Sequence, residues 1–193
     1  MVCSSKIACW LKNHYGENME APKTYDNFPA WIAILSNFVT MSIYAIGAYI
    51  LAGFGILFAI LYLLYCLWLE IRILRRSCVD CYYYGKVCGL GKGKLCALLF
   101  KKGDPQKFVE KKITWAQLLP DFMVSLIPLA SGIILLVRDF TWLLAALLII
   151  LGFLSFGGTA IIRGSFACKY CKQREIGCPA EQLFGSKEKT RSK

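Results

Sequence analysis

Two groups of three cysteines carry the clearest chemical signal in this sequence of 193 residues. Both groups have the spacing C-x2-C-x6-C, and their members are Cys78, Cys81, Cys88, Cys168, Cys171 and Cys178. The two thiolates of a C-x2-C pair can bind one soft metal ion, because a tight turn brings them together. Clustered thiols can also carry redox chemistry, so metal binding and electron transfer are both open interpretations.

The number of ligands limits how these thiols can be used. A structural zinc site has four protein ligands, so each group of cysteines is one ligand short. Cys96 can complete the first group, giving the set Cys78, Cys81, Cys88 and Cys96. No cysteine follows Cys178, and the second group would take its fourth ligand from Cys3, Cys9 or His14.

The repeated spacing also allows one shared site. If a pseudo-twofold axis relates the two halves of the chain, the two C-x2-C pairs face each other and close a single tetrahedral site. Cys88 and Cys178 would then remain as a second pair. We favour zinc as the metal. An iron–sulfur cluster is the alternative, because Cys178-Pro179 resembles the end of bacterial ferredoxin motifs, although the other spacings differ from those motifs.

The elements that must position these cysteines are membrane-spanning helices. Hydrophobic residues make up 57% of the chain and the mean hydropathy is +0.51, whereas soluble domains are about 45–50% apolar. No charged residue occurs in residues 28–69, a stretch long enough for two spanning helices. The predicted fold is all-α and polytopic, with four transmembrane helices near residues 30–50, 53–74, 116–137 and 140–162.

We interpret the four spans as two hairpins that arose by internal duplication, each followed by a cysteine group. Gly47, Gly53 and Gly55 lie where the first hairpin should reverse, and glycine permits a tight turn. Arg138 and Asp139 interrupt the later apolar stretch and should form the second turn. The chain is thus divided into an N-terminal segment, a first hairpin, a cysteine-rich loop, a second hairpin and a cysteine-containing tail, at residues 1–29, 30–76, 77–114, 115–162 and 163–193.

The distribution of charge predicts the orientation in the membrane. The net charge is +11; residues 70–114 contribute +7 (eleven Lys/Arg, four Asp/Glu) and residues 163–193 contribute +5 (eight against three). Lys and Arg are enriched on the cytoplasmic side, so we expect an integral protein of the cell membrane with both termini in the cytoplasm. Expected partners are the lipid bilayer, anionic lipid head groups and a cytoplasmic protein, but not nucleic acid. Disulfides are disfavoured because the cytoplasm is reducing.

Several shorter features give further expectations. Residues 7–11 place apolar side chains at helical spacing, which fits a short helix on the membrane surface. The glycine- and lysine-rich run 89–94 is expected to be a flexible basic loop, and Asp121 is expected to cap the start of the third span. Cys66 lies within the second span and should be a small packing residue. The spans contain almost no polar residues that could line a transport path.

The layout of four spans with a cysteine-rich loop in the middle is similar to that of the DHHC palmitoyltransferases. The Asp-His-His-Cys motif of that family is absent, and His14 is the only histidine. DsbB-like and VKOR-like thiol oxidases also carry C-x2-C pairs, but theirs act near the outer face of the membrane. The predicted outer turns of this chain contain no cysteine.

Three functions fit the pattern. The favoured one is a non-catalytic scaffold whose zinc-stapled, basic cytoplasmic surface docks a partner. The second is a membrane redox protein with iron–sulfur clusters or reactive thiols. The third is a small transporter, because internal duplication is common in that class. No catalytic constellation is present in the sequence, so a function other than catalysis is favoured.

Overall fold

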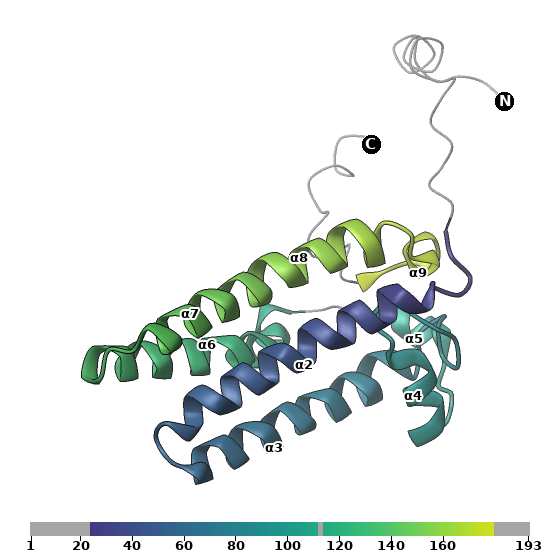
Figure 1. Cartoon of the computed structure of the whole chain (residues 1–193). Helices are drawn as coiled ribbons and strands as arrows, with labels where there is room; N and C mark the ends of the chain where they lie inside the picture. Colours follow the sequence, from purple (N-terminus) through teal and green to yellow (C-terminus); the bar gives the residue numbers. More distant parts are fainter. Residues whose placement is uncertain (1–23, 112–113, 180–193) are drawn as a thin grey trace, which may run out of the picture.

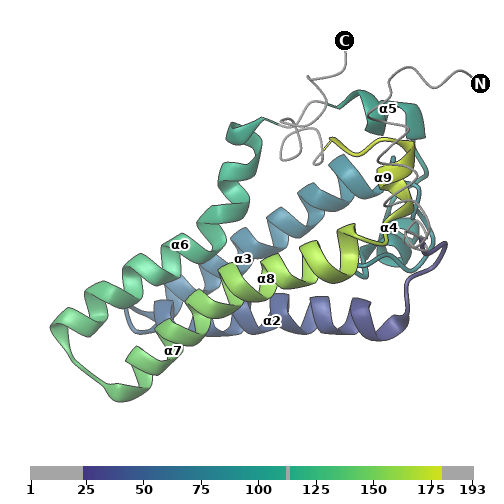
Figure 2. The ribbon, with the colours of Figure 1, turned by 90° about the horizontal axis from the view of Figure 1, so that it is seen from above.

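The computed structural model describes residues 24–111 and 114–179, which form a bundle of long helices with short helices at one end (Figures 1 and 2). The first two long helices are α2 (Ala30–Ala52) and α3 (Ile56–Ile73), and α3 continues as the π-helical η1 (Leu74–Cys78). The next are α6 (Trp115–Arg138) and α7 (Trp142–Gly152), and α7 continues through η2 (Phe153–Gly158), α8 (Thr159–Ile161) and η3 (Ile162–Cys168). The short helices are α4 (Lys92–Leu99), α5 (Pro105–Glu110) and α9 (Lys172–Ile176). No strand occurs among the described residues, as the all-α prediction requires.

Four helical segments are long and apolar enough to cross a membrane, the number that the predicted polytopic fold requires: Ala30–Ala52, Ile56–Cys78, Trp115–Arg138 and Trp142–Cys168. The last segment ends six residues beyond the predicted end at Ile162 (168 − 162). The helix continues past Arg163, whose side chain lines a polar cavity between the long helices. Consequently Cys78 and Cys168, the first cysteines of the two groups, end spanning helices and do not begin loops.

Helix α2 occupies the centre of the bundle, because it contacts α3, α6, α7 and the π-helical segments that follow α7. The buried core draws on all of the long helices and consists of Ile43, Ile50, Leu51, Tyr62, Cys66, Leu69, Val124 and Leu151. Only 2% of Cys66 is exposed, which confirms its expected packing role. Large apolar side chains such as Ile34 and Ile149 point outward from the bundle, 67% and 73% exposed. Such a surface is suited to lipid.

A tyrosine compensates for a proline where α3 meets α6. Pro128 has no backbone N–H, so the carbonyl of Val124, four residues earlier in α6, loses its helical donor. The buried Tyr62 hydroxyl of α3 donates to that carbonyl oxygen at 2.8 Å. Gly47 of α2 makes room for this tyrosine, since a Cβ there would lie 2.5 Å from the Tyr62 oxygen. The prediction that Gly47 belongs to the hairpin turn is therefore wrong, because α2 runs through it.

The two reversals lie close to their predicted positions. The chain turns between α2 and α3 at Gly53–Gly55, and Gly55 has a φ of 134°, which favours glycine. Helix α6 ends at Arg138 and the chain reverses there into α7. The expectation for Asp121 is wrong: α6 already begins at Trp115, so Asp121 lies inside the helix and does not cap it.

Both reversals lie at one end of the bundle, and the short helices with the cysteine-bearing segments lie at the other (Figures 1 and 2). The cysteine-bearing segments share one end because each pair of long helices returns the chain to the end at which it entered. The predicted surface helix at residues 7–11 lies outside the described residues.

Candidate functional site

The two C-x2-C pairs adopt the same backbone turn. We call residues 78–91 the first cysteine segment and residues 168–178 the second. Cys78 ends η1, and its carbonyl accepts a hydrogen bond from the Cys81 N–H at 3.4 Å. Cys168 ends η3, and its carbonyl accepts from the Cys171 N–H at 3.3 Å. The equal sequence spacing therefore produces equal local geometry at the ends of two different spans.

A buried tyrosine joins the two segments. Tyr83 of the first segment is 2% exposed, and its hydroxyl donates to the backbone oxygen of Tyr25 at 2.6 Å. The same hydroxyl accepts from the backbone N–H of Lys172, in the second segment, at 2.9 Å. The N–H of Tyr25 in turn donates to the carbonyl of Tyr170 at 3.0 Å. The residues that lead into α2 thus hold the two segments side by side.

Two further contacts tighten this junction. The side-chain oxygen of the buried Gln173 accepts from the Tyr82 N–H at 2.8 Å, while its amide nitrogen donates to the carbonyl of Gly177 at 3.0 Å. Gly89 lies directly against the end of the last span, because a Cβ at this position would lie 2.8 Å from the Cβ of Ala167. There is therefore no room for a side chain at position 89, where the first segment packs against the last span.

These contacts bring together the second and third cysteines of both groups. Cys81, Cys88 and Cys171 pack against the same buried aromatic cluster, which contains Phe28 and Tyr83. The Cys81 thiol also lies within electrostatic range of Cys88, Cys171 and Cys178. Cys81 and Cys88 of the first segment thus share one aromatic cluster with Cys171 of the second.

Burial keeps the central thiols protonated at neutral pH. Burial, with smaller contributions from the neighbouring thiols, raises the pKa of Cys81 to about 11, although a hydrogen bond with the Tyr83 backbone partly opposes this effect. Burial likewise raises the pKa of Cys171 to about 11, although backbone N–H groups of Gln173 and Arg174 partly oppose this effect. A metal ion binding here would have to displace the thiol protons, which would make binding dependent on pH.

The other predicted ligands are placed differently. Cys96 is fully buried in α4, and its sulfur lies 3.7 Å from the backbone oxygen of Leu74. Cys78 lies within electrostatic range of Cys81, Cys88 and Cys96, whereas Cys168 is exposed. Among residues 24–111 and 114–179, no three His, Cys, Asp or Glu side chains form a group that could hold a metal ion. Cys3, Cys9 and His14 lie outside the described residues. The assignment of the seven cysteines as ligands therefore stays a prediction.

An exposed ion pair borders the site. The carboxylate of Asp26 lies 2.6 Å from the Lys172 ammonium and accepts from the Tyr82 hydroxyl at 2.7 Å. The hydrogen bonds from Lys172 and Tyr82 lower the pKa of Asp26 below its ordinary value. Because the pair is open to solvent, it contributes little to stability and serves chiefly to orient the residues before α2.

The sequence did not indicate a polar cavity that lies within the bundle. Its volume is about 360 Å³, and α2, α3, α6 and the π-helical segments surround it. Its polar lining consists of Ser36, Thr40, Tyr44, Glu70, Lys92, Asp121, Ser125, Ser155, Thr159 and Arg163. The buried Ser155 hydroxyl has no hydrogen-bond partner in the part of the chain that the structure describes. The expectation of spans almost without polar residues is therefore wrong for this cavity.

Glu70 organises one wall of the cavity. Its carboxylate accepts from the Tyr44 hydroxyl at 2.8 Å and forms an ion pair with Lys92. Lys92 begins α4, so the expectation of a flexible basic loop over residues 89–94 is wrong at this residue. Glu70 was visible in the sequence as the first charged residue after the long apolar stretch, but its partners are distant in sequence and gave no local signal.

Burial makes Cys81 and Cys171 poor nucleophiles. Attack requires a thiolate, and the buried Cys81 and Cys171 thiols are neutral at physiological pH. Lys172 lies beside Cys171 in sequence, but its ammonium is bound to Asp26.

In comparisons with protein-family models, with curated proteins and with solved structures, nothing matches this chain. Its function must therefore be inferred from the geometry of the thiols and cavities.

Proposed function

We propose that this chain is a multi-pass membrane protein that carries one shared thiolate metal site and uses the surrounding basic surface to dock a cytoplasmic protein. Zinc is the metal we favour, because four thiolates suit its tetrahedral coordination. The ligand set we propose is Cys81, Cys88, Cys171 and Cys178, because it takes thiols from both of the joined segments. The observation that carries this proposal is the junction of the two segments, where Cys81, Cys88 and Cys171 pack against one buried aromatic cluster.

Metal binding would stabilise the contact between the two cysteine segments. The second segment is joined to the first by a small number of hydrogen bonds, chiefly through Tyr83 and Gln173. A metal ion held by thiolates from both segments would link them directly, and the free energy of metal binding would then stabilise the folded cap. The sulfurs must move toward one another to coordinate a metal ion, because they form no coordinating group among the described residues.

Orientation and duplication complete the proposal. Each pair of long helices ends in the same cysteine turn, so a helical hairpin with its turn is a plausible repeated unit. The residues that follow both turns are rich in Lys and Arg, which favours the cytoplasm for this end of the bundle. A reducing compartment would keep the thiols available for metal.

Elemental analysis of the full chain, purified without added metal, tests the proposal. We expect about one zinc per chain, and we expect Cys81→Ser and Cys171→Ser each to remove it. Cys66→Ser is the matched control, because that thiol is buried in the core of the bundle and should not affect metal content. Full zinc content in Cys171→Ser would contradict a shared site. Iron and a brown colour would instead favour the redox function.

A small transporter is the second candidate, and the polar cavity inside the bundle favours it. Glu70, Tyr44 and Lys92 form a charged group on one wall of this cavity. Ionisable groups at this depth often mark a substrate pathway. Ion flux through vesicles containing the full chain tests this function, with Glu70→Gln expected to abolish the flux and Cys66→Ser expected to preserve it. No flux from the unmodified chain would contradict it.

A further inference from the structure

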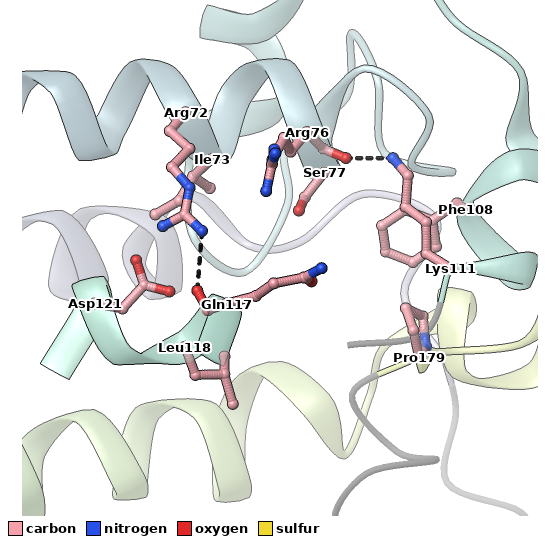
Figure 3. Close-up of a pocket in the computed structure, with 10 residues that line it drawn as sticks. All are labelled: Arg72, Ile73, Arg76, Ser77, Phe108, Lys111, Gln117, Leu118, Asp121 and Pro179. Atoms are coloured by element: carbon pink, nitrogen blue, oxygen red, sulfur yellow. Dashed lines mark hydrogen bonds between the residues drawn. The ribbon is translucent and has the colours of Figure 1, made fainter. Parts of the chain in front are cut away.

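A second cavity lies outside the bundle core, where the end of α3 and η1 meets the start of α6. Its volume is about 300 Å³. Arg72 and Arg76 extend into it from one side, and Gln117 and Asp121 of α6 lie on the other (Figure 3). Lys111 closes a third side. Neither the thiol site nor the docking function requires this cavity.

The cavity is positively charged, and one of its cations is unpaired. Lys111 is bound to Asp80 at 2.7 Å, and its ammonium also donates to the backbone oxygen of Arg76. Arg72 donates to the Gln117 carbonyl at 3.0 Å. Among residues 24–111 and 114–179, no carboxylate forms an ion pair with the exposed guanidinium of Arg76. The Arg76 guanidinium is thus available to an anion, whereas Lys111 already has its carboxylate partner.

The position of the cavity matches the depth of lipid head groups. It lies at the end of one spanning segment and at the beginning of another. Two aromatic residues of the kind found at membrane interfaces stand nearby: Trp68 is 52% exposed and Trp115 is 63% exposed. The Arg72 guanidinium lies over the Trp68 ring at 5.6 Å. The cavity thus combines cations with aromatic rings, as is typical of protein surfaces at the membrane–water interface.

Apolar side chains also line the cavity, beside its cations. Ile73, Leu118 and Phe108 line it beside the cations, so a ligand that fills it must combine a negative group with hydrocarbon. The carboxylate of Asp121 faces Arg72 at the same end of the cavity (Figure 3). An anion is therefore favoured at the Arg76 guanidinium, because Asp121 lies near Arg72 and the Asp80 carboxylate is paired with Lys111.

We infer that this cavity binds an anionic phospholipid from the adjoining leaflet, with its phosphate on the guanidinium of Arg76. A guanidinium can donate two parallel hydrogen bonds to one phosphate, which gives Arg76 the larger part in recognition. The glycerol and the first carbons of the acyl chains contact Ile73 and Leu118. The lipid thereby fills the space between α3 and α6 at the end of the bundle that carries the cysteines.

Lipid retention by the full chain tests this inference. The protein is exchanged into micelles that contain equal amounts of phosphatidylglycerol and phosphatidylcholine, and bound lipids are counted by native mass spectrometry. We expect a preference for phosphatidylglycerol, and we expect Arg76→Gln to weaken its binding about tenfold, because the charge-assisted hydrogen bonds are lost. Zinc content should not change in this variant.

Arg75→Gln is the matched control. Arg75 is the neighbouring residue, it is also exposed, and its guanidinium lies over the Phe100 ring at 5.9 Å, outside the cavity. Both substitutions remove one positive charge at the same depth. Equal losses in the two variants would overturn the inference, because the effect would then be one of diffuse charge. It would also be overturned by equal retention of both lipids, or by displacement of the lipid by millimolar inorganic phosphate.

Discussion

The two cysteine segments share one turn but differ in what supports them. The first segment is held within its own half of the chain: the Gly85 N–H donates to the Gly93 carbonyl at 3.1 Å, and the Tyr84 hydroxyl donates to the Phe100 carbonyl at 2.7 Å. Contacts to the second segment come instead from Tyr82, Tyr83 and the residues before α2. The difference teaches that sequence spacing determined the turn, while tertiary contacts determined the position. The second segment is placed by the first, which favours one shared site over two equivalent ones.

Removal of the Tyr83 hydroxyl should weaken the attachment of the second segment to the first more than any other substitution considered. Tyr83→Phe keeps the ring but leaves the Tyr25 carbonyl and the Lys172 N–H without their partner. We expect the free energy of unfolding to fall by about 2–3 kcal/mol, since buried polar groups lose their hydrogen bonds. Hydrogen exchange should become faster at residues 170–174. Tyr84→Phe is the control, because its hydroxyl bonds only within the first half of the chain. Equal exchange in the two variants would contradict the proposed support.

Gly89→Ala should separate the segments with a slightly smaller effect. The added methyl would meet the Cβ of Ala167 at 2.8 Å and the Cα at 3.2 Å. We expect a loss of about 1–2 kcal/mol from overpacking, measured as a lower denaturation midpoint. Gly164→Ala is the control, because Gly164 lies in η3 near Ala167 but an added methyl group there meets nothing within 4 Å. This substitution should be neutral or stabilising. A neutral Gly89→Ala would show that the two segments are not in tight contact.

The reactivity of the thiols should depend on pH in a defined direction. The pKa of Cys81 and of Cys171 in the folded chain is about 11, above the ordinary thiol value of about 8.5–9. Protonation of these buried thiols thus favours folding below pH 9, and this contribution is lost as the pH rises toward 11. In metal-free protein, alkylation of both should remain slow up to about pH 9 and then accelerate. Exposed Cys168 is the internal reference for access. Rapid alkylation of Cys81 at pH 7 would contradict its burial.

The exposed ion pair at the border of the site should matter least. Asp26→Asn removes the pairing with Lys172 but leaves the hydrogen bonds of Tyr83 in place. The lowered pKa of Asp26 means that its contribution is present above the ordinary carboxyl pKa of about 4 and is lost as the pH falls below it. We expect a change in melting temperature of no more than about 1 °C at pH 7. A large change would show that this pair, and not Tyr83, joins the segments.

The spans and the reversal at Arg138 could be predicted because both depend on local composition. The partner of Tyr62 could not. Pro128 indicates from the sequence alone that the Val124 carbonyl lacks a helical donor, but only the packing of α3 on α6 supplies the tyrosine. The ion pair of Glu70 with Lys92 was missed for the same reason, because it depends on where α4 folds back.

For the candidate site, the spacing identified the two thiol turns but not the role of each thiol. Cys96 looked like a fourth ligand by its position in the sequence, yet its sulfur is directed at the Leu74 carbonyl. The meeting of Cys81 with Cys171 depends on Tyr25, Tyr83 and Gln173, which are ordinary polar residues in a sequence pattern. Contacts between segments so distant along the chain leave no periodic signal.

Thiol footprinting of the full chain in membrane vesicles tests the shared site most directly. Alkylation of each cysteine is measured by mass spectrometry, with zinc present and after its removal by a chelator. We predict that zinc protects Cys81, Cys88, Cys171 and Cys178 together, that chelation exposes them together, and that Cys168 reacts in both states. Protection confined to the first segment and Cys96, or no difference between the two states, would contradict the account.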